Sequence, residues 1–459
     1  MAQNRSKSEP SMKNSPSLAR SPFSALPIPE PRFQRSRLDN GLMVATFPMP
    51  WLHEVGVTLF VRAGSRFERE EEVGIAHLLE HMLFKGIASI PDPTRFHEKL
   101  ESLAADMNAA TGQETNAYWI TMPPEHLDEA LELFCEMFTQ PALAGLETER
   151  KVVLAEMRED ENDQGEMTNM GVLAGAKLWP EHPLARPILG TRESLAGIDE
   201  AALRRFLGNY YCASNMAIAF FGPVEQGQAV ALCDRVLGSL PSAPKLYPGA
   251  GSLALPPLPP PMPVGPHWVA VNDQTAQFGL TISFRTGGLR SCDYHPVAAL
   301  RRLLDDGFSS RLQSTVREKK GLVYDVWASM TLHSDTGALE VGASVSPDNL
   351  EEVYLALMAE LDRLGEAPPP EAEWQRLITR WRAGLMSALD RPSEMMERYV
   401  ADPLFEIQEP FSRSWECIQA VDPLALPQLA RALTQPENRV VVLVGPKARE
   451  LLPILQKLS

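Results

Sequence analysis

The sequence predicts an α+β protein of two similar domains arranged around a cleft. In each half of the chain, two strand-like runs are followed by a helical pattern, and a proline-dense stretch separates the halves. A diverged internal duplication leaves this kind of repeated order in a sequence. At 459 residues the chain is also long enough to bury two hydrophobic cores.

The repeated elements are visible in the spacing of the apolar residues. In the first half, the runs 42–47 and 55–61 are dominated by β-branched and other apolar residues, which predicts strands. The runs 267–271 and 278–284 open the second half in the same way, and the apolar positions of 297–304 then predict a helix. The order strand, strand, helix therefore occurs twice.

Composition divides the chain into four segments. Residues 1–32 are rich in Ser, Pro and basic residues and lack a long apolar run, so we expect a disordered tail and no secretory signal. The scarcity of acidic residues in this tail is typical of transit peptides, but its prolines would break an amphipathic helix. Residues 33–240 and 267–459 are the two predicted domains. The proline-dense segment 241–266 predicts an extended linker, with a proline-rich ligand for an aromatic groove as the alternative.

The motif His77-Leu-Leu-Glu80-His81 is the strongest chemical signal in the chain. On a helix at ~100° per residue the two imidazoles lie ~40° apart and one turn along, so both can reach one metal ion. Glu80 lies on the same side, close enough to deprotonate a water molecule whose pKa zinc lowers toward ~7. The reversed zinc-peptidase signature has this form. A pair of packed core histidines is the alternative. Apolar residues at helical spacing place the motif on a buried helix: Val73, Ala76, Leu79, Leu83 and Phe84.

A catalytic zinc usually has three protein ligands and an open fourth position, so a third ligand is expected elsewhere. The partly apolar helical segment 149–157 offers Glu149 and Glu156. Two helical turns separate these carboxylates by ~10 Å, so only one of them can bind the metal directly. The other would orient a ligand. A solvated acidic face is the alternative, and the spacing alone leaves the choice between the two glutamates open.

These residues resemble the pitrilysin (insulinase) family of zinc metallopeptidases, in particular its short bacterial members related to the mitochondrial processing peptidase. The resemblance rests on the H-x-x-E-H motif and on Glu156 in E-R-x-V-V-x-x-E, and it extends from about Phe33 to the C-terminus. Further matching stretches are Asn40-Gly-Leu, Arg62-Ala-Gly-Ser-Arg, Met107-Asn-Ala-Ala-Thr-Gly-Gln-Glu-Thr and His182-Pro-Leu-Ala-Arg-Pro-Ile-Leu-Gly.

The resemblance implies two homologous domains, each an antiparallel sheet flanked by helices, facing each other across a chamber. It implies one zinc ion per chain, bound by His77, His81 and Glu156 in the first domain. Glu80 would be the general base, and Glu149 would lie just outside the ligands and orient one of them.

The second domain carries a further element of the same resemblance, Arg317 and Tyr324 in an Arg-x6-Tyr pattern. In the family, the tyrosine donates a hydrogen bond to the oxyanion and the arginine helps to hold the substrate backbone. Groups of this kind stabilise charge that develops on a carbonyl oxygen. Without the resemblance, Arg317 would be an ordinary surface charge and Tyr324 an ordinary residue at the core edge. Two departures are minor: Trp119 replaces an expected Tyr or Phe, and the glycine-rich segment is only Gly287-Gly288.

The segment 106–120 is the predicted substrate-binding strand. Its mixture of β-formers with Asn and Thr is typical of an edge strand, to which an extended peptide can add as a further strand. The resemblance places Asn108 and Ala109 beside the scissile bond. A plain edge strand is the alternative. Strand addition requires an exposed main chain, so it favours unfolded peptides over folded proteins.

Composition limits the partners and the compartment. A net charge of −16, from 43 basic and 59 acidic residues, argues against nucleic acid or an anionic membrane as the main partner. No apolar run of about 18 residues predicts a membrane span. The chain has no C-x-x-C motif, which excludes a cysteine zinc site, and an odd number of scattered cysteines predicts a reduced, cytoplasmic compartment. The five cysteines are Cys135, Cys212, Cys233, Cys292 and Cys417.

The sequence therefore predicts a zinc-dependent endopeptidase that acts on unfolded peptides or presequences. One alternative is a scaffold subunit of the same fold that has lost catalysis, but such a subunit should show decay of the zinc motif. Another is one half of a heterodimer that matures a dedicated precursor. Because one chain carries the zinc motif together with Arg317 and Tyr324, we expect a homodimer.

Overall fold

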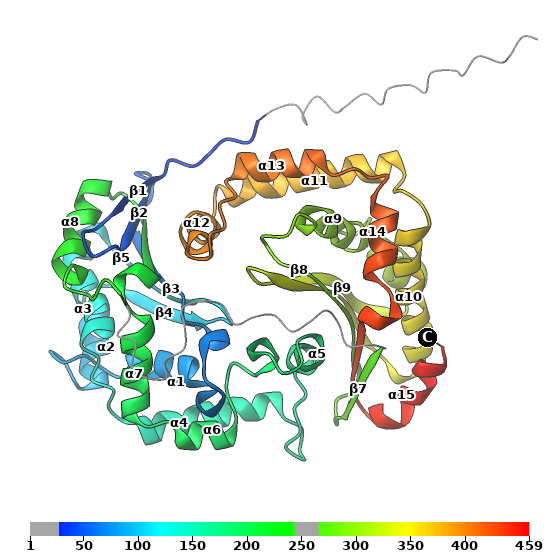
Figure 1. The fold of residues 1–459 in the computed structure, drawn as a ribbon, viewed down its shortest axis with the longest axis horizontal. Helices are drawn as coiled ribbons and strands as arrows, with labels where there is room; N and C mark the ends of the chain where they lie inside the picture. The colour runs from blue at the N-terminus through cyan, green and yellow to red at the C-terminus, as the bar shows by residue number, and fades with distance from the viewer. Residues whose placement is uncertain (1–26, 244–265, 459) are drawn as a thin grey trace, which may run out of the picture.

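The computed structural model describes residues 27–243 and 266–458. It consists of two halves, each with one β-sheet and its own set of helices (Figure 1). Most of the predicted tail (1–32) and almost all of the predicted linker (241–266) lie outside the described residues. The predicted α+β fold of two similar domains is confirmed.

The first half is built on a six-stranded sheet with the order β1-β2-β6-β3-β5-β4. Neighbouring strands are antiparallel, except that β2 and β6 are parallel. The edge strand β4 is the segment that sequence reasoning assigns to substrate binding. The strands are β1 (Gln34–Arg37), β2 (Met43–Pro48), β3 (Val55–Val61), β4 (Asp106–Thr111), β5 (Asn116–Met122) and β6 (Met216–Gly222).

The second half repeats this path in a five-stranded sheet with the order β7-β11-β8-β10-β9. If β1 is left out, the two sheets follow the same order. The first and last strands pair in parallel, β2 with β6 and β7 with β11, and the third strand, β4 or β9, lies at the edge. Each sheet therefore contains one parallel pair where sequence reasoning expects only antiparallel pairs, because the last strand inserts beside the first. The strands are β7 (His267–Asn272), β8 (Phe278–Gly287), β9 (Val323–Leu332), β10 (Thr336–Val345) and β11 (Arg439–Gly445).

Helices cover the outer sides of both sheets. Figure 1 shows α3 and α8 on the far side of the first sheet from the second half, and α10 and α15 on the far side of the second sheet. The helices in the first half of the sequence are α1 (Ile75–Leu83), α2 (Pro93–Ser102), α3 (Leu127–Thr139), α4 (Leu146–Glu156), α5 (Met170–Leu178), α6 (Arg192–Gly197), α7 (Glu200–Tyr210) and α8 (Gln226–Leu237). Of these, α5 packs on the second sheet (Figure 1). Those of the second half are α9 (Tyr294–Leu304), α10 (Leu350–Glu366), α11 (Glu371–Ala388), α12 (Pro392–Met396), α13 (Phe411–Ala420), α14 (Leu426–Leu433) and α15 (Ala448–Lys457).

One hydrophobic core lies mainly in the first half, and a second lies mainly in the second half but includes residues of the first sheet. A third, smaller cluster packs α5 against the second sheet. The helices contribute to these cores through apolar stripes. In α3, Leu127, Ala130, Leu131, Phe134 and Phe138 are buried, and their spacing places them on one face of the helix. Burial of one such large side chain stabilises the fold by about 1.5–3 kcal/mol. Because two of these clusters include residues of both halves, they hold the sheets and the two halves together as a platform for the side chains of the site.

A buried ion pair joins the two halves. The fully buried guanidinium of Arg66 contacts both carboxylate oxygens of Asp335, at 2.7 and 2.9 Å, and it also contacts Glu114 at 2.7 Å. Glu114 in turn accepts hydrogen bonds from the backbone N–H and the hydroxyl of Ser334. The network therefore connects the loop after β3 with the turn between β9 and β10.

Residues 27–32 also connect the halves, although sequence reasoning places them in a disordered tail. Ile28 is only 3% exposed and belongs to the hydrophobic cluster that includes residues of both halves. Glu30 accepts hydrogen bonds from the backbone N–H of Ser412, at 2.6 Å, and from the hydroxyl of Tyr399. These contacts correct the predicted boundary, because this short segment packs on the folded body.

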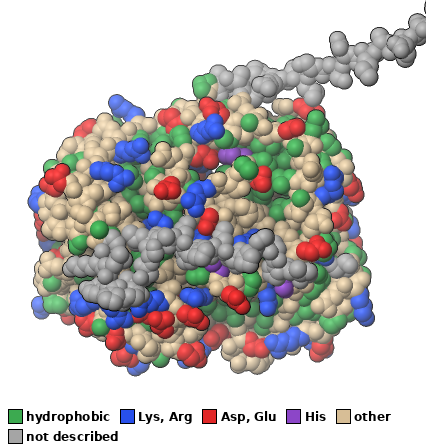
Figure 2. Space-filling model, viewed as in Figure 1, with side chains coloured by type: hydrophobic (Ala, Val, Ile, Leu, Met, Phe, Trp, Pro, Cys, Tyr) green, Lys and Arg blue, Asp and Glu red, His purple; other side chains and the backbone are tan. Residues whose placement is uncertain are grey.

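The surface carries both charge signs. Figure 2 shows acidic and basic side chains interspersed over one face, so the acidic excess of the chain is not gathered into a single patch there. Within 27–243 and 266–458, no helix is long and apolar enough to cross a membrane.

Candidate active site

Helix α1 carries the three motif residues, as the apolar spacing predicts. Ile75, Leu78, Leu79 and Met82 are fully buried and fix the helix against the first core. His77 is 8% exposed, while Glu80 and His81 are half-buried. The apolar face therefore holds the helix so that its polar residues point away from the core toward α4 and β4.

The N-terminus of α1 is held by a residue that sequence reasoning missed. The Glu68 carboxylate accepts hydrogen bonds from the backbone N–H groups of Gly74 and Ala76, both at 2.9 Å. These are N–H groups that a helix leaves without partners at its first turn. Burial raises the pKa of Glu68 to about 8. An acidic residue a few positions before the motif helix is the signal that could have identified it.

Two glycines allow the chain to enter α1 at this point. Gly74 has φ +93°, and a Cβ there would lie 2.8 Å from the Cα of Gly190 and from the carbonyl oxygen of Leu189. Gly190 is the last residue of the stretch 182–190, which is part of the family resemblance described above. This stretch therefore supports the motif helix by close backbone contact.

The predicted metal ligands converge on one point. The Nε2 atoms of His77 and His81 each lie 3.7 Å from a carboxylate oxygen of Glu156, which ends α4. One potential ligand atom from each of the three residues lies within 4.8 Å of the others. The structure therefore resolves what spacing left open, because it places Glu156 with the histidines.

Glu149 occupies a different position, on the other side of the His81 ring. Its Oε2 lies 3.3 Å from His81 Nδ1, and its Oε1 lies 2.7 Å from Lys85 Nζ. Glu149 is 5% exposed, so it is a buried acidic residue and not part of a solvated face. Lys85 balances its charge, and this lysine was not identified from the sequence.

The donor set fits a zinc ion. Two ligands at ~2.05 Å from a tetrahedral zinc lie about 3.3 Å apart, and the observed nitrogen–oxygen separations of 3.7 Å are close to this distance. They are also too long for hydrogen bonds, so the three side chains converge without bonding to one another. Burial and the charge of His81 lower the pKa of His77 to about 4, which keeps this imidazole neutral. Neutral imidazole is the form that binds metal.

Glu80 lies beside this cluster and is held by a neighbour from the edge strand. The hydroxyl of Thr111, the last residue of β4, donates a hydrogen bond to Glu80 Oε2. Burial raises the pKa of Glu80, which makes its carboxylate more basic. Thr111 lies within the predicted substrate strand, but no local sequence pattern indicates that it reaches the motif helix.

The predicted substrate strand has a free edge. β4 pairs with β5 on one side and has no partner strand on the other within the described residues. Asn108 is exposed, and its side-chain oxygen accepts a hydrogen bond from the backbone N–H of Ala109 at 2.8 Å. The edge position that the sequence predicts is therefore present.

Arg317 and Tyr324 lie together in the second half. The Arg317 guanidinium is 5.7 Å from the centroid of the Tyr324 ring and 5.6 Å from that of Phe308. Tyr324 is 85% exposed, so it is not a core-edge residue. It lies on β9, the strand that corresponds to β4 in the repeated topology. In the described part of the chain, no hydrogen bond or ion pair connects either residue with the histidine cluster.

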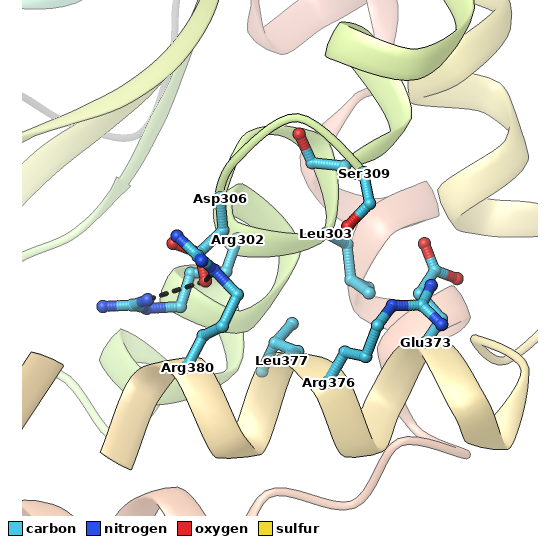
Figure 3. Close-up of a pocket in the computed structure, with 9 residues that line it drawn as sticks. Arg302, Leu303, Asp306, Ser309, Glu373, Arg376, Leu377 and Arg380 are labelled. Atoms are coloured by element: carbon cyan, nitrogen blue, oxygen red, sulfur yellow. Dashed lines mark hydrogen bonds and ion pairs between the residues drawn. The ribbon is translucent and has the colours of Figure 1, made fainter. Parts of the chain in front are cut away.

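A small charged pocket between α9 and α11 is a separate feature (Figure 3). Arg302 and Arg380 both contact Asp306, and Arg311 binds Glu373, so each of these three arginines has an acidic partner. Its volume of about 30 Å³ is sufficient for water and far too small for a peptide. This pocket is therefore not the substrate site.

Comparison with known families decides the classification. Residues 44–192 match the model of the insulinase family, peptidase family M16, and residues 197–380 match that of the peptidase M16 inactive domain. A zinc protease of Mycobacterium bovis is 30% identical over 379 residues, which cover 80% of this chain and 82% of that protein. The chain belongs to peptidase family M16. Another relative, a zinc protease of Rickettsia felis, is 28% identical over 368 residues, covering 78% of this M16 chain and 84% of the relative.

Solved structures share the fold of this M16 protein. A protease from Helicobacter pylori superimposes with a TM-score of 0.80 at 22% identity, over 91% of this chain and 100% of that one. The first half of the periplasmic protease PqqL from Escherichia coli gives a TM-score of 0.74 at 21% identity, over 94% and 97% of the two chains. The family resemblance and the two-domain fold are therefore confirmed.

Proposed function

We propose that this protein is a zinc-dependent endopeptidase that hydrolyses unfolded peptides or presequences. The observation that carries the proposal is the convergence of His77, His81 and Glu156 on one point, with Glu80 next to them. Its relatives are named zinc proteases, which supports the same reaction class.

The residues of the site have distinct roles in this proposal. His77, His81 and Glu156 would hold one zinc ion per chain, and when bound this ion would lower the pKa of a water molecule so that hydroxide is available at neutral pH. Glu80 takes the proton of that water, and its raised pKa suits a general base. Thr111 fixes the orientation of the Glu80 carboxylate, and Glu149 fixes the His81 ring.

The substrate binds as an added strand along β4. The free edge there offers backbone groups, and Asn108 and Ala109 lie on it. Tyr324 and Arg317 come from the opposite half: Tyr324 donates a hydrogen bond to the oxyanion, and Arg317 holds the peptide backbone. The exposure of Tyr324 supports this role, because its hydroxyl is free to meet a substrate.

The active peptidase is favoured over a non-catalytic scaffold of the same fold because all five residues of the metal region are present and lie close together, without the decay of the motif expected in a scaffold. A heterodimer that matures one dedicated precursor is the second candidate. The single chain carries both the metal cluster and the Arg317–Tyr324 pair, and this favours a homodimer. We further propose a cytoplasmic location, and no nucleic-acid or membrane partner, on the basis of composition.

Metal removal tests the proposed reaction class. A chelator should abolish cleavage of a mixture of unstructured peptides, and added zinc should restore it. Glu156→Gln should lower the zinc content, whereas the exposed Glu147→Gln on the same helix should not. Full cleavage by the metal-free protein would contradict the proposal, and an unchanged zinc content in Glu156→Gln would place the third ligand elsewhere.

A further inference from the structure

A large cavity lies between the first sheet and the second half of the chain. Its volume is about 730 Å³, within the range of sites that hold organic ligands. One wall is formed by β3, β4 and β5, and the opposite wall by residues 392–401, which comprise α12 and the following π-helical turn. Figure 1 shows α12 reaching from the second half toward the first sheet. The cavity is therefore complete only when both halves are in place.

The strand register aligns side chains across the first wall. Ala110 on β4 lies opposite Ala117 on β5, which lies opposite Phe60 on β3, and all three residues line the cavity. In the next row, Asn108 lies opposite Trp119, and Trp119 also lines the cavity. These rows end at the free edge of β4, where the peptide is proposed to bind.

The intervening residues of β4 connect this wall with the candidate active site. Side chains alternate between the two faces of a strand, so Ala109 and Thr111 point the opposite way from Ala110. Ala109 packs against the first core, and the hydroxyl of Thr111 reaches Glu80, although Thr111 also borders the cavity at the end of the strand. A peptide that pairs with β4 continues the same rows, so every second side chain faces the cavity while its neighbours face α1.

We propose that this cavity is a specificity pocket for a bulky apolar side chain of the bound peptide. This inference rests on the proposed peptidase function and names the class of side chain that the site selects. Most of the wall is aliphatic or aromatic, including Phe60, Trp119, Phe221 and Met396. Among the described lining residues the only charged groups are Glu54 and Glu397, which disfavour an acidic side chain. The aliphatic and aromatic wall thus suits a large apolar residue such as Phe, Leu or Met.

Substitutions from each wall test the pocket. Ala117→Phe fills it from the first sheet, and Met396→Ala removes part of the wall that the second half supplies. Ala372→Phe is the control, because Ala372 lies exposed on α11 and outside the pocket.

Zinc-loaded wild type should cleave unstructured peptides with a bulky apolar residue at one fixed position. Ala117→Phe should lower kcat/KM on those peptides by about tenfold or more. Its rate on peptides with Ala at that position should stay near that of wild type, and Ala372→Phe should match wild type on both sets.

A binding measurement separates failure of the pocket from failure of the proposed reaction. Zinc-loaded Glu80→Gln is titrated with a short Ser/Thr peptide that carries one central Phe, and with the same peptide carrying Ala. The Phe peptide should bind about tenfold more tightly, and adding Ala117→Phe or Met396→Ala should remove most of this difference. Equal binding of the two peptides, or a preference for the Phe peptide that survives both substitutions, would contradict the proposed specificity pocket. Absence of cleavage by wild type with intact Phe-selective binding would instead contradict the reaction and leave the pocket supported.

Discussion

Oε2 of Glu149 lies 3.3 Å from Nδ1 of His81, and Nε2 of the same ring lies 3.7 Å from Glu156. The two carboxylates of α4 thus hold one imidazole between them. A group that contacts the far nitrogen fixes the tautomer and orientation with which a histidine binds metal. This geometry would let two acidic residues seven positions apart both serve the proposed metal ion, with only Glu156 as a direct ligand.

Glu149→Ala should weaken zinc binding by about 10–100-fold, because His81 loses the carboxylate that orients it. Competition with a chromogenic chelator measures this affinity. Glu147→Ala is the matched control on the same helix, since the Glu147 side chain is 78% exposed and contacts only Arg150 among the described residues. If the two variants bind zinc equally well, Glu149 has no role at the metal.

Gly74→Ala should destabilise the protein by about 1–3 kcal/mol, because the residue has φ +93° and a Cβ would meet the backbone of Gly190 at 2.8 Å. Gly197→Ala at the end of α6 is the control: no atom lies within 4 Å of a Cβ there, so the change should be nearly neutral or slightly stabilising. Denaturant unfolding with zinc bound measures both. A neutral Gly74→Ala would show that the close contact between Gly74 and Gly190 is absent in solution.

We expect His333 to make the free energy of unfolding depend on pH. It is buried near Arg66 and packs on Trp179, and burial lowers its pKa from 6.5 to about 4. His333 therefore binds a proton more tightly in the unfolded chain than in the folded chain. As a result, the free energy of unfolding decreases as the pH falls from about 6.5 to about 4. His333→Gln should flatten this part of the pH dependence of the unfolding free energy. A variant with the same slope as wild type would exclude His333 as the titrating group.

Tyr324→Phe should lower kcat by roughly 10²–10³ while zinc content stays unchanged, by analogy with removal of one oxyanion donor. The exposed hydroxyl has no hydrogen-bond partner within the described residues, so its loss should cost little stability. Steady-state kinetics on one cleaved peptide separate kcat from KM. A change confined to KM would assign Tyr324 to substrate binding.

The clustering of His77 and His81 on one helix could be predicted from the sequence because its signal is local. The helical period places His77, Glu80 and His81 on one face of α1, and the repeated strand order predicts two similar halves. Contacts between distant segments leave no such signal. Thr111 reaches Glu80 across 31 positions, and Arg66 pairs with Asp335 across 269. The parallel pairing of β2 with β6 was missed for the same reason, because the returning strand inserts beside a partner far back in the chain.

The most direct test of the account compares zinc-loaded wild type with zinc-loaded Glu80→Gln on a mixture of unstructured peptides, with products read by mass spectrometry and zinc content measured on the same samples. Glu80 contacts Thr111 and is not one of the three converging ligands, so Glu80→Gln should keep its zinc and lose nearly all hydrolysis. Cleavage by wild type alone would support a self-sufficient peptidase with Glu80 as its base. Equal cleavage by the two zinc-loaded proteins, or none by wild type, would contradict this account.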